Sequence, residues 1–144
     1  MQQYQNFPDS VKMVIALPTV RWTQKAKAII ASLWAIAEND IGVFVADNSE
    51  NPEKHEFLSN LSSCNKNFIT FCHEKNIGAT ANFFFLMDCC SSVDYVAIMA
   101  DDDWFSPEYY IDAYKFISKN PDVSAVESGA TFVDFGDNNF IKVN

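Results

Sequence analysis

Three adjacent carboxylates, Asp101, Asp102 and Asp103, are the residues of this sequence with the clearest potential for chemistry. They directly follow the apolar run 95–100, and adjacent carboxylates at a strand end repel one another, more so when partly buried. A hard divalent cation relieves that repulsion, and Mg²⁺ or Mn²⁺ is typically held by one or two carboxylates together with phosphate oxygens. The run therefore indicates either a metal site or a solvated acidic loop that leads into the next helix.

Three further groups of polar residues follow apolar runs in the same way. Asp47 could accept a hydrogen bond from a base or a ribose, or form an ordinary Asx turn. Asn76 and Gly78 could let the backbone approach a ligand closely, or form a plain loop. Arg21 could pair with phosphate or lie in solvent. These groups are Pro18-Thr19-Val20-Arg21 after the run 11–17, Asp47-Asn48-Ser49 after 41–46, and Asn76-Ile77-Gly78 after 67–73.

The elements that position these groups alternate between short apolar runs and segments of helical periodicity. Runs such as IGVFVA are typical of strands buried on both faces of a parallel sheet, and Thr23, Asn51-Pro52 and Ser106-Pro107 are typical helix starts. Alternation of this kind predicts an α/β fold with a mainly parallel sheet, whose strands end at one common rim where ligands bind. The predicted strands are 11–17, 41–46, 67–73, 95–100 and 123–127, the predicted helices follow Thr23, Asn51, Gly78 and Ser106, and a β-hairpin is predicted at 131–135 and 140–143.

Length and composition restrict the possible partners. The 144 residues suit one domain, and 10 Lys and Arg against 19 Asp and Glu give a formal charge of -9. That acidity argues against nucleic acid and anionic membrane surfaces, and a phosphate ligand would need a metal ion because side-chain cations are scarce. The first ten residues are no signal peptide, no apolar run reaches the roughly 20 residues of a membrane span, and the four cysteines are expected to be reduced and mostly buried. We expect a cytoplasmic protein.

Taken together, the four groups resemble the motifs of glycosyltransferase family 2, which has the GT-A fold. The resemblance runs in the right order from about residue 11 to residue 143, and its most specific part is the aspartate run with Pro107 downstream. It implies a Rossmann-like domain that binds a nucleotide-diphosphate sugar with Mn²⁺ or Mg²⁺ and transfers the sugar to a hydroxyl of a glycan or lipid-linked acceptor. An inverting, hexosyltransferase-like reaction is also implied by the resemblance.

The resemblance implies roles for residues at the nucleoside end of the donor. Pro18 and Thr19 would line the base, with Val20 and Arg21 standing where the family usually has Tyr-Asn or Tyr-Asp. Asp47 would hydrogen-bond the base. Three residues would belong to the loop and helix start beside the nucleotide: Asn76, Gly78 and Asn82.

The aspartate run takes the roles nearest the phosphates. Counting back from Pro107, Asp101 matches the position that contacts ribose, and Asp102 matches the metal-binding position, with Asp103 beside it in the metal shell. The acceptor-binding half of the family is missing after residue 144, so we expect an N-terminal part of a longer enzyme. The resemblance assigns no general base. Three carboxylates near the end of the sequence are poor substitutes for the one that the acceptor-binding half normally supplies: Glu127, Asp134 and Asp137.

Two other classes of function remain open. A non-catalytic module could keep the crevice and bind the nucleotide-sugar without transferring the sugar. A receiver-like signalling domain would also bind Mg²⁺ at acidic strand ends, but there the acidic cluster should not follow the fourth strand, and a lysine should end the fifth. No Gly-rich phosphate loop follows any predicted strand, so kinase and dehydrogenase functions are weakly supported.

Overall fold

The structure is a computed structural model that describes residues 6–103 and 105–126, and the backbone of 132–134 and 141–143. The chain divides into two compact units, Met1–Ile111 and Asp112–Asn144. The first unit holds a parallel sheet with three helices and the start of a fourth, and the second holds the rest of that helix and a pair of strands. One domain over residues 1–144, as part of a longer enzyme, stays a prediction.

The first unit is built on four parallel strands in the order β3-β2-β1-β4, which confirms the predicted α/β class. β1 pairs with β2 from Met13, opposite Ile41, to Thr19, opposite Asp47. β1 therefore continues through Pro18 to Thr19, two residues beyond the expected end, because β2 offers a neighbour of equal length. The strands are β1 (Met13–Thr19), β2 (Ile41–Asp47), β3 (Phe68–Cys72) and β4 (Tyr95–Ile98).

Local capping signals begin two of the helices where the sequence predicts them. The Thr23 side chain accepts a hydrogen bond from the Ala26 N–H at 3.1 Å, and the Asn51 side chain accepts one from the Lys54 N–H at 3.1 Å. Each cap satisfies a backbone donor that the first helical turn leaves without a partner. The helices are α1 (Gln24–Ile36), α2 (Pro52–Cys64), α3 (Ala79–Cys89) and α4 (Pro107–Lys119).

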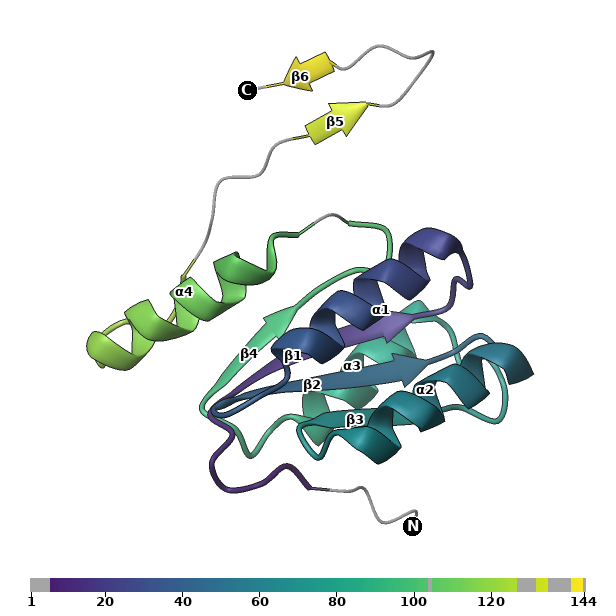
Figure 1. Ribbon diagram of the computed structural model, residues 1–144, viewed down its shortest axis with the longest axis horizontal. Coiled ribbons are helices and arrows are strands. Elements are labelled where there is room, and N and C mark those ends of the chain that lie inside the picture. The colour runs from purple at the N-terminus through teal and green to yellow at the C-terminus, as the bar shows by residue number, and fades with distance from the viewer. Residues whose placement is uncertain (1–5, 104, 127–131, 135–140, 144) are drawn as a thin grey trace. The chain divides into compact units, whose positions relative to one another are not determined.

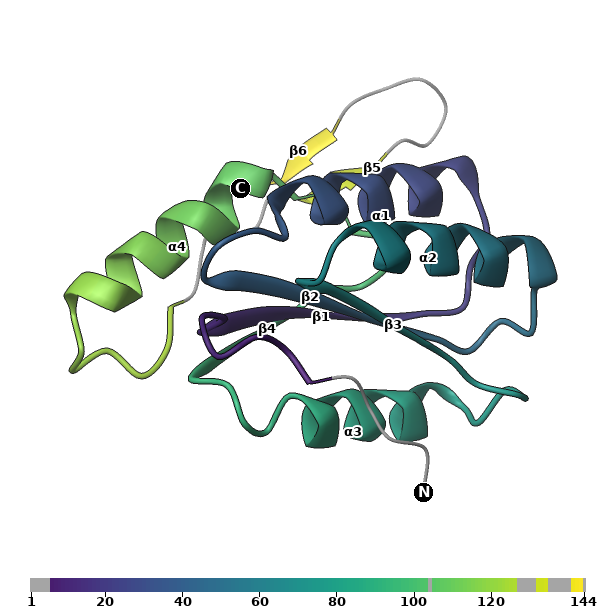
Figure 2. The ribbon, with the colours of Figure 1, turned by 60° about the horizontal axis from the view of Figure 1, so that its bottom comes forward.

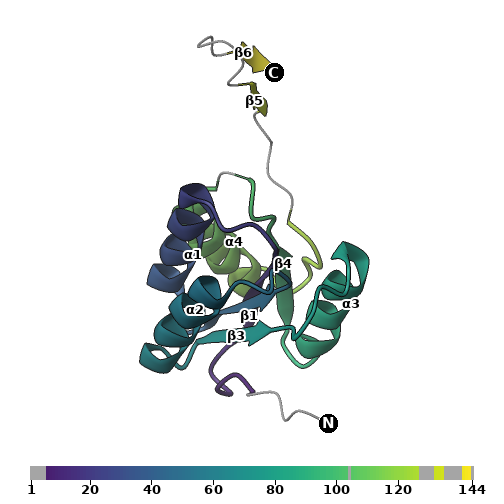
Figure 3. The same cartoon turned by 90° about the vertical axis from the view of Figure 1, so that its right-hand side faces the viewer.

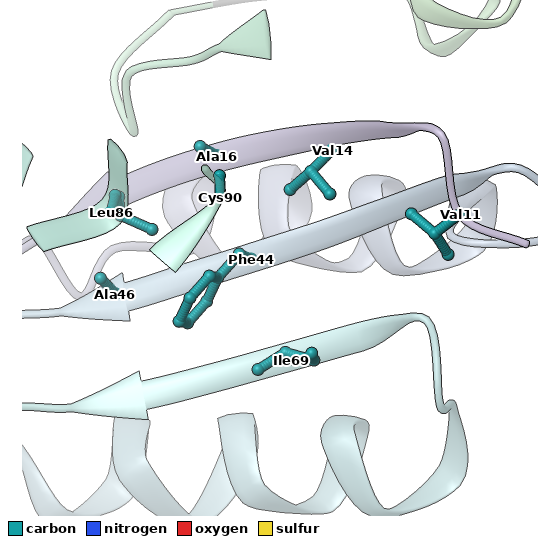
Figure 4. Packing of buried hydrophobic residues seen from close by; sticks show 8 residues of the cluster. All are labelled: Val11, Val14, Ala16, Phe44, Ala46, Ile69, Leu86 and Cys90. Atoms are coloured by element: carbon teal, nitrogen blue, oxygen red, sulfur yellow. The ribbon is translucent and has the colours of Figure 1, made fainter. Parts of the chain in front are cut away.

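Helices cover both faces of the sheet in the first unit. α1 and α2 lie on one face and α3 lies on the other, as the ribbon shows from three sides (Figures 1, 2 and 3). The two central strands, β1 and β2, are buried almost throughout, which explains their continuous apolar sequences. On the α3 face, Leu86 and Cys90 pack against side chains of β1, β2 and β3 (Figure 4): Val14, Ala16, Phe44, Ala46 and Ile69.

The buried face of α3 differs from the apolar face that its sequence suggests. Phe83 and Leu86 are three positions apart, a spacing that predicts one shared buried face, but Phe83 is 37% exposed and Phe84 is 61% exposed. Asn82 is buried in their place, because its side-chain N–H donates to the Ala46 carbonyl at 3.0 Å and fixes the rotation of the helix. The helix therefore presents a polar residue to the sheet and leaves phenylalanine rings exposed.

The second unit contains an antiparallel pair, β5 (Phe132–Asp134) with β6 (Ile141–Val143), where the sequence predicts a hairpin. The fifth strand that we expected at 123–127 is wrong for residues 123–126, which adopt no strand. Their backbone has no pairing strand among the described residues, and an apolar run without a partner edge does not form a sheet. Residue 127 lies outside the described residues.

Two further expectations from the sequence are tested by the structure. The four cysteines are free, as expected, but Cys90 alone among them is buried and Cys64 is exposed, so the expectation that most are buried is wrong. Within the described ranges, the helices are all too short or too polar to cross a membrane.

Candidate functional site

An open pocket of about 510 Å³ lies at the carboxyl ends of β1 and β4. The strand order changes direction here: the chain leaves β1 through α1 toward β2, whereas β4 is reached through α3, on the opposite face. The loops that follow β1 and β4 therefore diverge and leave a crevice between them. The pocket is at the rim where the sequence places its polar groups.

Most of the residues that the sequence predicts as a nucleotide-sugar site line this pocket, namely Pro18, Thr19, Val20, Arg21, Asn76, Asn82, Asp101 and Asp102. Asp47 and Gly78 do not line it, and neither does Asp103, the second predicted metal ligand. Six lining residues were not predicted. Four lie at or just after strand ends, Asn48, Ile98, Met99 and Ala100, and two lie in α3, Ala79 and Phe83.

Asp101 joins the end of β4 to the loop after β1. Its Oδ2 accepts hydrogen bonds from the Thr19 hydroxyl at 2.8 Å, the Val20 N–H at 3.1 Å and the Arg21 N–H at 3.0 Å. Its Oδ1 accepts one from the Arg21 guanidinium at 2.6 Å. Burial alone would raise the pKa of Asp101, but these hydrogen bonds to the charged form outweigh it and hold the pKa below 3.8. The carboxylate is thus ionised and fully engaged in holding the pocket wall.

Asp102 presents the most accessible carboxylate among the pocket residues. Its side chain is 54% exposed, and its Oδ2 lies 3.1 Å from the Arg21 guanidinium. A half-exposed oxygen ligand beside an open pocket fits Mg²⁺ or Mn²⁺, which keep several water or phosphate oxygens in their shell. Asp103 is exposed and next in the chain, so it can reach the same ion from outside the pocket. Asp101 is engaged elsewhere, which leaves Asp102 as the principal candidate.

Asp47 lies beneath the pocket, fully buried, with partners at both oxygens. The Lys54 ammonium is 2.7 Å from Oδ1, and the Ser49 hydroxyl donates to Oδ2 at 2.7 Å. His55 Nε2 is 3.0 Å from Oδ2, but it is buried and forms no hydrogen bond in this orientation. The carboxylate therefore faces the Lys54 ammonium, the His55 imidazole and a hydroxyl, and its contact with the pocket runs through other residues.

Asp47, His55 and Cys72 place a carboxylate oxygen, an imidazole nitrogen and a sulfur within 4.8 Å of one another. Such mixed donors suit zinc better than magnesium. Lys54, however, already supplies a positive charge to this carboxylate. Burial also raises the pKa of the Cys72 thiol to about 11, so the sulfur is protonated at neutral pH. The carboxylate thus already has a protein cation and the sulfur keeps its proton, and none of the three residues lines the pocket.

Side-chain amides form the other end of the pocket. The Asn48 amide donates to Asn76 Oδ1 at 3.0 Å and accepts from the Ile77 N–H at 2.8 Å. Asn76 Oδ1 also accepts from the Gly78 N–H at 2.8 Å, which closes the loop on itself. Asn82 also lines the pocket. Its Oδ1 lies 2.9 Å from His73 Nε2 inside the protein. The amides give this end neutral donors and acceptors, in contrast to the charged end at Asp102 and Arg21.

The comparison with protein families bears on the functions left open by the sequence. The model of glycosyl transferase family 2 matches residues 16–142, which is most of the chain. The chain belongs to glycosyl transferase family 2. The resemblance to this family that we inferred from the four polar groups is confirmed. The family match excludes the receiver-like alternative.

A solved structure confirms the fold of this family 2 chain. The crystal structure of S. aureus TarS 1-349 is similar, with a TM-score of 0.55 and 17% sequence identity. The likeness covers 77% of this chain and 33% of the TarS chain, so this chain spans about a third of that structure. At this identity it shows the fold alone, an α/β fold of the GT-A type. No curated protein matches the chain.

Proposed function

We propose that this chain is the nucleotide-sugar-binding part of a metal-dependent glycosyltransferase. The reaction would move a sugar from a nucleotide-diphosphate donor to a hydroxyl of a glycan or lipid-linked acceptor. One observation carries the proposal within the family: the pocket at the ends of β1 and β4 is lined by a charged pair, Arg21 with Asp102, and by a hydrogen-bonded pair of amides, Asn48 with Asn76. A nucleotide-sugar has the matching polarity, since its diphosphate is charged and its base and ribose carry neutral donors and acceptors.

The diphosphate belongs at the charged end in this proposal. Asp102 would hold Mn²⁺ or Mg²⁺, with Asp103 in reach from outside the pocket. The ion, when bound, supplies positive charge against the phosphate oxygens of the leaving group. Arg21 adds a second positive group beside it, which is needed because the formal net charge of the chain is -9. The remaining acidic surface would repel a diphosphate.

The nucleoside belongs at the amide end. Pro18, Thr19 and Val20 supply the wall for the base, and Asn76 and Asn82 line the same pocket. Asp47, which does not line the pocket, and Asp101, which does, take part through their neighbours in this proposal, because their oxygens are engaged by protein donors. Gly78 gives this loop a backbone conformation that glycine adopts readily, since its φ is +87°. A Cβ there would meet no atom within 4 Å.

The chemistry of transfer rests on family membership alone. An inverting displacement and a hexose donor are proposals on that ground. No general base is assigned, since the side chains of Glu127, Asp134 and Asp137 lie outside the described residues. A cytoplasmic location stays a prediction, which the four free thiols support, because disulfides are rare in that compartment.

Calorimetry with nucleoside diphosphates in the presence and absence of Mn²⁺ tests the proposal. We expect Mn²⁺-dependent binding that Asp102→Asn weakens about tenfold or more, since one charged ligand to the ion and its phosphates is lost. Asp94→Asn is the matched control: it removes the same charge from an exposed residue before β4, at the opposite end of the strand. Equal affinity in the Asp102 and Asp94 variants would refute the metal assignment, and no binding by the unaltered protein would refute the function.

A further inference from the structure

Lys54 is the most unusual side chain of the first unit outside the pocket. It lies in the first turn of α2, and its side chain is fully buried, a state that lysine almost never adopts without a partner. Burial lowers its pKa, and the hydrogen bond to Asp47 acts in the opposite direction. Lys54 does not line the pocket, so no ligand in that pocket can contact it. Its ammonium must therefore act on protein groups.

The ammonium has a second contact besides Asp47. Lys54 Nζ lies 2.8 Å from the Thr19 hydroxyl oxygen, across 35 positions of sequence. An ammonium can only donate, so the Thr19 oxygen accepts this hydrogen bond. The single proton of the Thr19 hydroxyl is then left for Asp101 Oδ2, at 2.8 Å. Lys54 thus sets the direction of the hydrogen bond that joins β1 to the end of β4.

The consequence reaches the wall of the pocket. The same oxygen of Asp101 accepts from the backbone N–H groups of Val20 and Arg21, which form part of that wall. Four segments are connected in this way: the end of β2 through Asp47, α2 through Lys54, the end of β1 through Thr19, and the turn after β4 through Asp101. Charges alternate along the connection, from carboxylate to ammonium to carboxylate to the Arg21 guanidinium.

We propose that Lys54 is a positioning residue of the donor pocket, which orders the loop 19–21 through Thr19 and Asp101. The inference rests on the proposed function for the identity of the ligand, but not for the ordering of the loop. A lysine that only neutralised Asp47 would affect stability and leave the loop unchanged. Because Lys54 also contacts Thr19, we expect its removal to make the loop 19–21 less ordered.

The test separates ordering of the loop from stability. Lys54→Met leaves Asp47 buried without a cation, which strongly destabilises a protein and can prevent folding. Combining it with Asp47→Asn removes both charges and restores most of the stability, but Thr19 still has no ammonium. Thr19→Val removes the hydroxyl that joins Lys54 to Asp101, whereas Thr19→Ser keeps a hydroxyl there and should behave like the unaltered protein. Leu58→Ala is the matched control, because Leu58 is fully buried on α2, one turn after Lys54, and its apolar side chain can form none of these hydrogen bonds.

Amide hydrogen exchange of Val20 and Arg21, followed by NMR in the ligand-free protein, is the first measurement. We compare exchange rates after correction for each variant's loss of global stability. After that correction, we expect exchange at least about tenfold faster in the double variant and in Thr19→Val, and an unchanged rate in Leu58→Ala. Affinity for a nucleoside diphosphate with Mn²⁺ is the second, with a loss of about 3- to 30-fold in the same variants. The Asp47→Asn single variant gives the part of that loss that belongs to Asp47.

The outcomes distinguish this inference from the function it rests on. If the unaltered protein binds no nucleotide, the proposed function fails, and the exchange rates still decide the role of Lys54. Unchanged exchange at Val20 and Arg21 in the double variant overturns the inference. So does a loss of affinity that Leu58→Ala reproduces in proportion to its loss of stability, because Lys54 would then act on stability alone.

Discussion

Asp101→Asn is the substitution whose effect the structure determines most closely. The side chain is 5% exposed, and the carboxylate accepts hydrogen bonds from the Thr19 hydroxyl, the Val20 and Arg21 N–H groups and the Arg21 guanidinium. Asparagine has nearly the same shape, so the core keeps its packing. It has only one acceptor oxygen, no charge and an NH₂ group that can only donate, so the substitution removes the charge together with one acceptor position.

The magnitude follows from these contacts. A hydrogen bond to a charged group contributes about 1.5–3 kcal/mol, and one between neutral groups about 0.5–1.5 kcal/mol, so each of the three bonds to Oδ2 weakens by about 1 kcal/mol. The Arg21 pair adds little, because that guanidinium is half-exposed and screened by solvent. We expect Asp101→Asn to lower the free energy of unfolding by about 3–4 kcal/mol near neutral pH.

The pH dependence provides a second check. The pKa of Asp101 is lowered in the folded protein, so the unfolded state binds more protons than the folded state between that pKa and 3.8. The stabilisation by this charge is therefore complete above about pH 4 to 5 and is lost as the pH falls through the pKa of the folded state. The difference between the unaltered protein and Asp101→Asn should be constant from about pH 5 to 7 and shrink toward pH 3.

Urea unfolding followed by circular dichroism measures both effects. Asp94→Asn serves again as the control, with an expected change below about 0.5 kcal/mol because the side chain is exposed. A loss below about 1 kcal/mol in Asp101→Asn, or a difference that is as large at pH 3 as at pH 6, would show that the four hydrogen bonds do not hold the carboxylate as the structure describes.

Three further substitutions test other parts of the site. Asp47→Ala should destabilise the protein by about 3–5 kcal/mol in thermal or urea unfolding, because it leaves the buried Lys54 ammonium without its ion partner; a change below 1 kcal/mol would contradict the buried pair. Gly78→Ala should cost about 1–3 kcal/mol in the same assay, from its φ of +87° and ψ of 157° alone, since no atom lies near the added carbon; a neutral substitution would contradict this backbone conformation. Arg21→Met should raise the affinity for Mn²⁺, measured by electron paramagnetic resonance, by about two- to fivefold, because an exposed ion pair with Asp102 no longer competes; weaker Mn²⁺ binding would show that Arg21 does not compete.

The sequence predicts most of the sheet and helices because their signals are local. Thr23 and Asn51 cap the helices that they precede, and the continuous apolar runs of β1 and β2 correspond to strands buried on both faces. The error at 123–126 has a related cause. A short apolar run resembles a strand in sequence, but a strand also needs an edge to pair with, and that edge is not encoded nearby.

The candidate site is predictable to the extent that strand ends converge. Asp102 and Arg21 lie at one rim as expected, since the carboxyl ends of parallel strands meet there. Lys54 could not be recognised, because a lysine in the first turn of a helix resembles an ordinary surface residue, and its partner Thr19 is 35 positions away. The burial of Lys54 also explains Asp47. The position of Asp47 at the strand end was predictable, but its burial depends on the Lys54 ammonium, which reaches it only in the folded structure.

The hydrogen bond between Thr19 and Asp101 also has a consequence for the order of folding. It joins residues 82 positions apart, and closing a loop of that length costs about 4 kcal/mol in chain entropy. The strand that carries Asp101 toward Thr19, β4, pairs with β1 over only four residues, Met13 to Ala16, whereas β2 pairs with β1 over seven. We therefore expect β4 to join the sheet last and to leave it first. A chain that has assembled only β1, β2 and β3 has no pocket, so ligand binding reports the completed sheet, and a ligand that spans both strand ends holds the final strand in place.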